Sequence, residues 1–130
     1  MKQPLAGKVV LVTGGAVRLG RALVERLAGE GCRMVIHCHR STTAARSLVK
    51  VLRARGAEAA VVRGSLNSQA SCERIMRSAH KIHGRLDVLI NSAAAFTKEP
   101  MGSISAHSLL HEFWPNLFAP VLLTQAFAAA

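Results

Sequence analysis

A short run of apolar residues, Val9 to Val12, leads directly into a turn that contains two glycines. The run is too short for a helix and does not alternate polar with apolar residues, so it predicts a strand buried on both faces, as in a parallel sheet. Gly14 and Gly15 let the chain turn at the strand's carboxyl end, and neither carries a Cβ where a ligand must approach. A helix expected over 18–30 then offers unpaired N–H groups. This stretch predicts a pyrophosphate site.

The rest of the chain alternates apolar runs with segments of helical periodicity. Strands are expected at 33–38, 57–63 and 86–90. The intervening helices are expected to begin at Ser41 or Thr42 and at Asn67 or Ser68, and to end at glycines 56 and 84. This alternation predicts βαβ units, a parallel sheet and helices on both faces. The 130 residues are expected to form one domain.

The last segment is expected to be an interrupted helix that begins at Ser103 or Ser105. Pro115 and Pro120 each remove a backbone donor and clash with the preceding turn, which predicts a kink or a break. Apolar residues lie on more than one side of this helix, at positions 109, 110, 113, 117, 121 and 122. We therefore expect it to be buried against an element that these 130 residues do not contain.

The glycine turn resembles that of a known enzyme family. Thr13-Gly14-x-x-x-Arg18-x-Gly20 is similar to the T-G-x-x-x-G-x-G turn of the short-chain dehydrogenase/reductases, with the middle glycine replaced by arginine, as is typical of the pteridine reductase branch. The resemblance implies that Gly14, Arg18, Leu19 and Gly20 bind the cofactor. The alternative is a tight strand-to-helix turn of some other α/β protein.

The resemblance extends from Lys8 to about Phe127 but covers only the amino-terminal part of such an enzyme. It implies a Rossmann-type α/β fold with strand order 3-2-1-4, incomplete on the side of the fourth strand. Residues 1–130 would then be an NADP-binding half-domain. An open apolar edge of this kind predicts poor solubility, domain swapping or a missing partner.

The loop after the second strand reads His37-Cys38-His39-Arg40-Ser41 and contains no carboxylate. In nicotinamide-binding folds an acidic residue here binds the ribose 2′-hydroxyl and repels a 2′-phosphate. His39, Arg40 and Ser41 could instead surround a phosphate dianion with charge-assisted hydrogen bonds, so we expect NADPH as the cofactor. The His-x-His-Arg-Ser string also resembles the pteridine reductases. The alternative is a solvated basic turn.

Two further loops match the family with changes. Ser65-Leu66 stands where the family has Asp-Leu or Asp-Val near the adenine, so both residues are expected to contact the cofactor. Asn91-Ser92-Ala93-Ala94 resembles the Asn-Asn-Ala-Gly motif, in which the asparagine ties neighbouring strands together. From this motif we carry over Asn91 and Ala93 as cofactor-binding residues.

The resemblance also implies a substrate site and one catalytic residue. Phe96 corresponds to an aromatic that stacks on the pterin ring, and Arg18 to a residue that contacts both pterin and cofactor phosphate; a loop phenylalanine that packs onto the core is the alternative. Asn116 corresponds to the helix asparagine that holds a proton-relay water. The family's Tyr-x-x-x-Lys pair has no counterpart, because the chain contains no tyrosine.

The composition argues against several other classes of protein. The formal charge of +10 is concentrated in residues 1–65, where twelve Lys and Arg stand against three acidic residues. These cations are spread over helices and loops, aromatics are few and no nucleic-acid module is recognisable, so nucleic acid is not expected as a partner. The most apolar stretch, 117–130, is too short to span a membrane. Three cysteines without a C-x-x-C pair suggest reduced thiols in the cytoplasm.

Six histidines suggest one check for a metal site. His80 and His83, and likewise His107 and His111, have spacings that share a helix face, but no third ligand set converges, so no metal is predicted.

The leading hypothesis is the cofactor-binding part of an NADPH-dependent oxidoreductase that reduces pterin-like or dihydrofolate-type small molecules. It would be completed by a carboxyl-terminal half or by another chain, and it could also form a homo-oligomer through residues 109–126. The alternative is a stand-alone dinucleotide-binding or interaction module without catalysis. A third hypothesis is a complete reductase whose proton donor is not a tyrosine, but no residue of the sequence has the necessary position.

Overall fold

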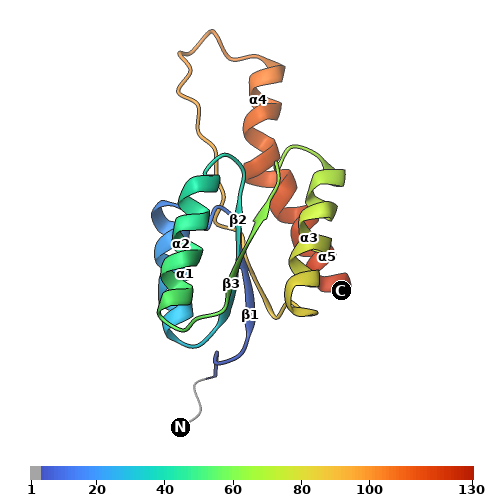
Figure 1. The fold of residues 1–130 in the computed structure, drawn as a ribbon. Coiled ribbons are helices and arrows are strands. Elements are labelled where there is room, and N and C mark those ends of the chain that lie inside the picture. The colour runs from blue at the N-terminus through green and yellow to red at the C-terminus, as the bar shows by residue number, and fades with distance from the viewer. Residues whose placement is uncertain (1–3) are drawn as a thin grey trace.

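A computed structural model describes residues 4–130 and shows four parallel strands that alternate with helices (Figure 1). The sheet order is β3-β2-β1-β4, which confirms the order expected from the resemblance. The elements are β1 (Val9–Val12), α1 (Arg18–Gly29), β2 (Arg33–Cys38), α2 (Thr42–Ala54), β3 (Ala59–Arg63), α3 (Gln69–His83), β4 (Val88–Ile90), α4 (Ala106–Phe113), the π-helical turn η1 (Trp114–Phe118) and α5 (Ala119–Ala129).

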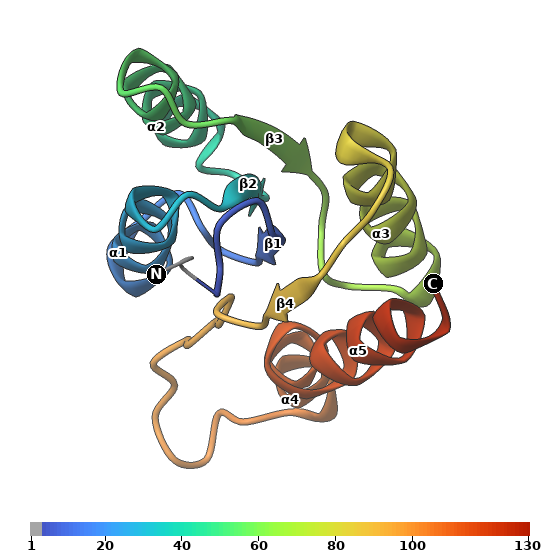
Figure 2. The same ribbon diagram turned by 90° about the horizontal axis from the view of Figure 1, so that it is seen from below.

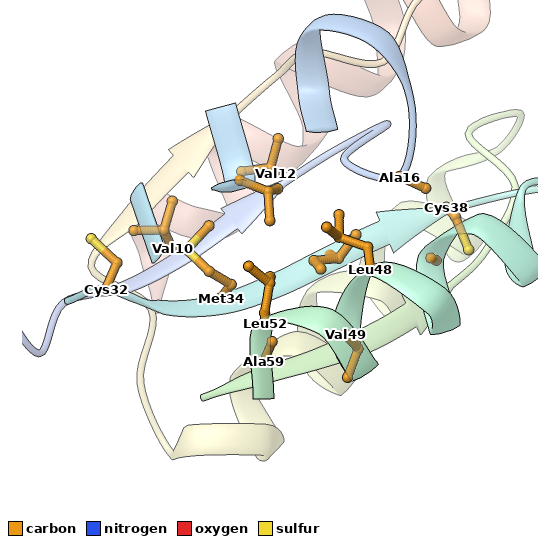
Figure 3. Packing of buried hydrophobic residues seen from close by; sticks show 13 residues of the cluster. Val10, Val12, Ala16, Cys32, Met34, Cys38, Leu48, Val49, Leu52 and Ala59 are labelled. Carbon is orange, nitrogen blue, oxygen red and sulfur yellow. The ribbon is translucent and has the colours of Figure 1, made fainter. Parts of the chain in front are cut away.

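Helices cover both faces of the sheet, as predicted. α1 and α2 lie on one face, and α3 and α5 lie on the other (Figure 2). Alternate residues of β1 enter the two cores: Val10 and Val12 pack toward α1 and α2, whereas Val9 and Leu11 pack toward α3 and α5. Figure 3 shows the first of these cores. A strand whose side chains pack into a core on each face needs apolar residues at every position. This explains why polar and apolar residues do not alternate along β1.

Two strands begin later than the sequence predicted. β3 starts at Ala59 instead of 57, because Gly56 has a φ of +85° and the N–H of Ala57 still bonds to a carbonyl of α2. β4 starts at Val88 instead of 86. There Asp87 precedes the ladder, and its carboxylate accepts the N–H of Val9 at 2.8 Å. The turn after α2 thus delays the start of β3, and at β4 the Asp87 side chain replaces a backbone acceptor for Val9, although the Asp87 N–H still bonds to the Val9 carbonyl oxygen at 2.9 Å.

The helix starts agree with the sequence except for one capping bond. Ser68 Oγ accepts the N–H of Ser71, and Ser105 forms a reciprocal capping box with Ser108. Ser41 stands at the N-cap of α2, but its side chain makes no capping bond. Its backbone (φ −80°, ψ 43°) is not the extended conformation that aims a capping hydroxyl at the helix start.

The expected interruption of the last helix takes the form of the π-helical turn η1. Pro115 lies in this turn, and Pro120 lies at the start of α5, where a missing N–H costs little. Because proline lacks the N–H of the normal ladder and clashes with the turn before it, a wider turn accommodates it between two α-helices.

The outer surface of α4, η1 and α5 is apolar and open. Leu109, Leu110, Phe113, Leu117 and Val121 are between 44% and 57% exposed. Among the described residues, β4 pairs only with β1, so its other edge is free. This is the incomplete side that the resemblance implied. None of the helices in residues 4–130 combines the length and apolar character that a membrane span requires.

Candidate functional site

The turn after β1 is built on glycines that cannot be replaced. Gly14 has a φ of +59°, and a Cβ on it would lie 2.9 Å from the Cα of Ala93. A Cβ on Gly20, in the first turn of α1, would lie 2.1 Å from the carbonyl oxygen of Gly14. The turn, the start of α1 and the loop after β4 are therefore pressed together, and Gly14 and Ala93, both expected at the cofactor, are neighbours.

Arg18 adopts the left-handed backbone conformation that glycine favours. Its φ is 50°, and no other non-glycine residue among residues 4–130 has a positive φ. This conformation costs an L-residue about 1–2 kcal/mol. The T-G-x-x-x-G-x-G turn has its middle glycine at this position, and glycine adopts a positive φ without strain. In this chain an arginine adopts the same strained conformation.

The amino terminus of α1 is suited to bind an anion. Its N-cap residue, Val17, has no polar side chain to occupy the first N–H groups, and the helical ladder begins with the N–H of Arg21 bonded to Val17. The N–H groups of Arg18, Leu19 and Gly20 thus lack intrahelical partners. Free donors at the positive end of a helix dipole fit the pyrophosphate of a dinucleotide.

Two polar residues that sequence reasoning left without a role join the loops of this edge. Thr13 is 1% exposed, and its Oγ1 accepts the N–H groups of Ser92 and Ala93, each at 3.0 Å. His37 is 2% exposed; its Nδ1 accepts the N–H of Gly14 at 3.2 Å, and its Nε2 lies 2.9 Å from the carbonyl oxygen of Gly64. The available signal was a polar residue placed next to the end of an otherwise apolar strand.

The loop after β2 presents exposed basic groups. His39 and Arg40 are exposed, and no salt bridge engages either side chain among the described residues. Arg63 at the end of β3 donates from Nε to the carbonyl oxygen of His39 at 3.2 Å and so brings a second guanidinium, beside that of Arg40, to this loop. The Ser41 hydroxyl makes no capping bond. The loop can therefore receive an anion with more than one negative charge.

The segment after β3 is held by α3. The Ser65 carbonyl oxygen accepts the hydroxyl of Ser71 at 2.5 Å, and Leu66 is 8% exposed and packs into the α3 side of the core. The Leu66 side chain therefore serves the core, and a cofactor could meet this residue only through its backbone or its exposed edge. Ser65 is partly exposed and keeps its hydroxyl available.

Asn91 bonds to a helix in this structure, and its expected contact with the cofactor stays a prediction. Its Nδ2 donates to Thr124 Oγ1 on α5 at 3.2 Å, so it ties the end of β4 to a helix and not to a neighbouring strand. The reason is that β4 has a strand on one side only within residues 4–130. The tie between β1 and the loop after β4 is made instead by Thr13.

Asn116 forms two hydrogen bonds with Ala95, the residue that precedes Phe96. Asn116, in η1, accepts the N–H of Ala95 at 2.8 Å and donates to its carbonyl oxygen at 2.7 Å. Asn116 therefore fixes the loop beside Phe96. The Phe96 ring is 88% exposed, so it does not pack onto the core, which was the alternative reading of this residue. Within residues 4–130, no three His, Cys, Asp or Glu side chains gather into a metal-binding group.

Comparison with known proteins identifies the family that the sequence resembles. The short chain dehydrogenase family model matches residues 8–130. Pteridine reductase 1 of Leishmania tarentolae is 30% identical, with 92% of this chain and 53% of that protein covered. Two solved structures are similar as well. A blue fluorescent protein from a metagenomic library in complex with NADPH has a TM-score of 0.91, 31% identity and coverage of 97% of this chain and 52% of that one.

The second structure is FolM alternative dihydrofolate reductase 1 from Brucella canis complexed with NADP. Its TM-score is 0.89 at 31% identity, with 97% of this chain and 51% of that one covered. The chain spans about half the length of the curated relatives it matches, for example 43% and 49% of two uncharacterized oxidoreductases. A match over nearly all of residues 8–130, on this glycine turn and this sheet order, shows that the chain belongs to the short-chain dehydrogenase family.

Proposed function

We propose that this chain is the NADPH-binding part of a pteridine-reductase-like oxidoreductase. The observation that carries the proposal is the loop after β2, where exposed His39 and Arg40 and the hydroxyl of Ser41 stand together without a carboxylate. Basic side chains such as these accommodate a 2′-phosphate, whereas the 2′-hydroxyl of NADH is best held by an acidic residue, which the loop lacks. The NADPH and NADP complexes of the two similar structures support the same cofactor.

Different loops at the carboxyl edge of the sheet would bind different parts of the cofactor. The N–H groups of Arg18, Leu19 and Gly20, with the open turn at Gly14, would bind the pyrophosphate. The loop of His39 would hold the 2′-phosphate. The remaining assignments are Ser65 and Leu66 beside the adenine, and Asn91 and Ala93 along the nicotinamide half. The bound cofactor supplies a hydride to the substrate.

The substrate class rests on Phe96 and Arg18. Phe96 is 88% exposed within the loop between β4 and α4, and such a ring can stack on a flat heterocycle such as a pterin or dihydrofolate ring. Arg18 lies at the start of α1 and could contact an anionic or carbonyl-bearing edge of such a ring. The similarity to a pteridine reductase and to an alternative dihydrofolate reductase supports this class. Asn116, which fixes the loop beside Phe96, would also hold a relay water.

The proton donor would come from outside these residues. The family's donor is a tyrosine beside a lysine, and this chain has no tyrosine. We therefore expect the 130 residues to bind NADPH without reducing a pterin, and expect reduction only with a carboxyl-terminal part or a second chain. The three cysteines are buried free thiols, which supports a reducing compartment such as the cytoplasm.

Isothermal titration with NADPH and NADH tests the cofactor assignment. We expect NADPH to bind about tenfold or more tightly than NADH, since charge-assisted bonds to one phosphate contribute 1.4 kcal/mol or more. Arg40→Asp should remove or reverse this preference. Arg46→Asp is the matched control, because Arg46 is also exposed but lies on α2 outside the loop. Equal affinity for both cofactors, or an equal effect of the two variants, would contradict the proposal.

A measurement of dihydropterin binding to the NADPH complex distinguishes the proposed reductase part from the alternative, a stand-alone dinucleotide-binding module. A reductase part should bind the pterin only when NADPH is present, and Phe96→Ala should weaken that binding while leaving NADPH affinity unchanged. A stand-alone module would bind NADPH and show no pterin binding under any condition.

A further inference from the structure

His37 uses both of its ring nitrogens to join two loops that its own strand separates. Nδ1 accepts the N–H of Gly14, in the turn after β1, at 3.2 Å. Nε2 lies 2.9 Å from the carbonyl oxygen of Gly64, which directly precedes the Ser65 segment. The side chain is 2% exposed, so water does not compete for either bond. One buried imidazole thus contacts the turn expected at the pyrophosphate and the loop expected at the adenine.

These two contacts fix the protonation state of the ring. An N–H group can only donate, so Nδ1 must be unprotonated to accept from Gly14. A carbonyl oxygen can only accept, so Nε2 must carry the proton. The ring is therefore the neutral Nε2–H tautomer. If Nδ1 gained a proton, two donors would face each other at the Gly14 contact, and the turn would have to move or lose a hydrogen bond inside a buried site.

We propose that His37 is a positioning residue for the cofactor: through the neutral Nε2–H tautomer it holds the turn at Gly14 and the loop at Gly64 in the single arrangement that receives both ends of the adenosine pyrophosphate. The inference rests on the proposed function, because it concerns the same binding edge. It adds a residue that contacts no expected part of the cofactor, and it predicts a pH dependence of binding. Gly14 is the sensitive partner, because its backbone is already pressed against Ala93.

The surroundings of His37 favour the neutral ring. Burial lowers the pKa of His37 below the ordinary value of 6.5, the bond to Gly64 opposes this change, and His39 lowers the pKa further. The turn over 13–17 and the segment over 64–68 contain no ionisable side chain. On α3, which covers this face, the buried ionisable group is Cys72, and burial raises the pKa of its thiol, so it stays neutral. Among residues 4–130, no carboxylate acts on the pKa of the ring to favour its charged form.

Three substitutions separate the two hydrogen bonds. His37→Asn places an amide oxygen near the position of Nδ1 and can keep the bond to Gly14. His37→Gln reaches the position of Nε2 with its amide and can keep the bond to Gly64. His37→Phe keeps a ring of similar shape but neither bond. Thermal unfolding of each variant, monitored by circular dichroism, selects the temperature at which all of them are folded for the binding measurements.

The first readout is the NADPH dissociation constant at pH 8. We expect His37→Phe to raise it about tenfold or more, as expected for two buried groups left without partners. His37→Asn should stay within about threefold of the unsubstituted chain, since it restores the bond to the pyrophosphate turn, and His37→Gln should lie between the two. A folded His37→Phe that binds NADPH as well as the unsubstituted chain would overturn the inference.

The second readout is the ratio of the dissociation constants of the unsubstituted chain and His37→Asn as the pH falls from 8 to 5. The ratio cancels the pH effects that both proteins share, including the titration of the cofactor's own phosphate. Because protonated His37 cannot accept from Gly14 and asparagine does not titrate, the unsubstituted chain should lose affinity relative to the variant below pH 6.5. A ratio that stays constant through the pH at which the ring signals of His37 titrate would contradict the proposed role of the tautomer.

The failure of this inference and the failure of the proposed function give different results. If the unsubstituted chain binds neither NADPH nor NADH, the proposed function fails and the positioning role fails with it. If NADPH binds but the variants and the pH change have no effect, only the positioning role fails. Nuclear magnetic resonance of the cofactor-free chain adds a readout that needs no ligand: the amide signals of Gly14 and Ser65 should shift together with the titration of His37, and independent shifts would argue against the link.

Discussion

The central strands β1 and β2 and the edge strand β4 differ in how completely the polar groups around them are hydrogen-bonded and the apolar groups buried. At the carboxyl ends of β1 and β2, buried Thr13 and His37 hold three loops together with five backbone contacts, and the glycines leave no room for a further atom. At β4 the strand is only half buried, and the helices beside it expose apolar side chains such as Leu117 and Val121. The first region is closed by its own residues, whereas the second lacks a covering element within residues 4–130.

The two regions therefore differ in whether they depend on further chain or on a partner. The geometry expected to receive a dinucleotide depends on contacts among residues 13–93, so it can form without further chain. The surface of α4, η1 and α5 gains stability only when something covers it, because exposed apolar area of this kind is stabilised by burial. Substitutions should therefore have large effects in the first region and on the inner side of α5, and small effects on the outer side of α5.

The largest effect is expected from Gly20→Ala. The new Cβ would lie 2.1 Å from the carbonyl oxygen of Gly14, which is far inside contact distance and belongs to backbone that cannot rotate away. We expect a loss of more than about 4 kcal/mol in unfolding free energy, or no folded protein at all. Gly29→Ala is the control in the same helix, since nothing lies within 4 Å of its Cβ position. It should raise stability by about 0.5–1 kcal/mol in urea titrations. Similar results for the two alanines would show that the turn is not closely packed.

The next effect contrasts two sides of α5. Leu123 is 1% exposed and packs on the α3 side of the sheet, whereas Val121 is 57% exposed. Leu123→Ala should lower the unfolding free energy by about 2–5 kcal/mol because it leaves a cavity. Val121→Ala should change it by less than about 0.5 kcal/mol. Guanidinium unfolding of both variants measures the difference, and a large effect of Val121→Ala in a dilute sample would mean that the outer side is already covered, for example by a second copy.

The smallest expected change in unfolding free energy concerns two threonines whose hydroxyl oxygens accept hydrogen bonds from the end of β4 and the loop after it. Thr13→Val removes the acceptor of two buried N–H groups and should cost about 1–3 kcal/mol. Thr124→Val removes the exposed partner of Asn91, where water replaces it, and should cost less than about 0.5 kcal/mol. Hydrogen exchange of Ser92 and Ala93 should accelerate only in the first variant. Equal acceleration in both would contradict the view that Thr13 alone joins β1 to the loop after β4.

The local pattern of the sequence was sufficient for most of the fold. Val9–Val12 and Arg33–Cys38 have the predicted bounds, because an uninterrupted apolar run between turn residues is what a doubly covered parallel strand requires. The start of β3 could not be predicted, since it depends on a helix carbonyl that captures the N–H of Ala57. The π-helical turn at Pro115 is similar: proline predicts an interruption, but the packing of neighbouring helices decides its form.

For the candidate site, the sequence located residue types but not their partners. The positions of Gly14, Arg18 and the His39 loop followed from motif spacing, and their binding roles stay predictions. The hydrogen bonds of Thr13 and His37 could not be foreseen, because each joins segments at least 23 residues apart that meet only after the strands are ordered in the sheet. The bond from Asn91 to Thr124 on α5 could not be foreseen for the same reason, and the expected role of Asn91 at the cofactor stays a prediction.

The double hydrogen bond between Asn116 and Ala95, together with the capping box at Ser105, has a consequence for how the chain can be cut. Residues 96–104 lie between these two fixed points and are exposed throughout. Trypsin should therefore cleave after Lys98 before it cleaves within the sheet. The two pieces should remain together without a covalent link, because α5 stays packed on α3 through Ala119 and Leu123. A nicked protein of this kind would migrate as one species under native conditions and as two after denaturation.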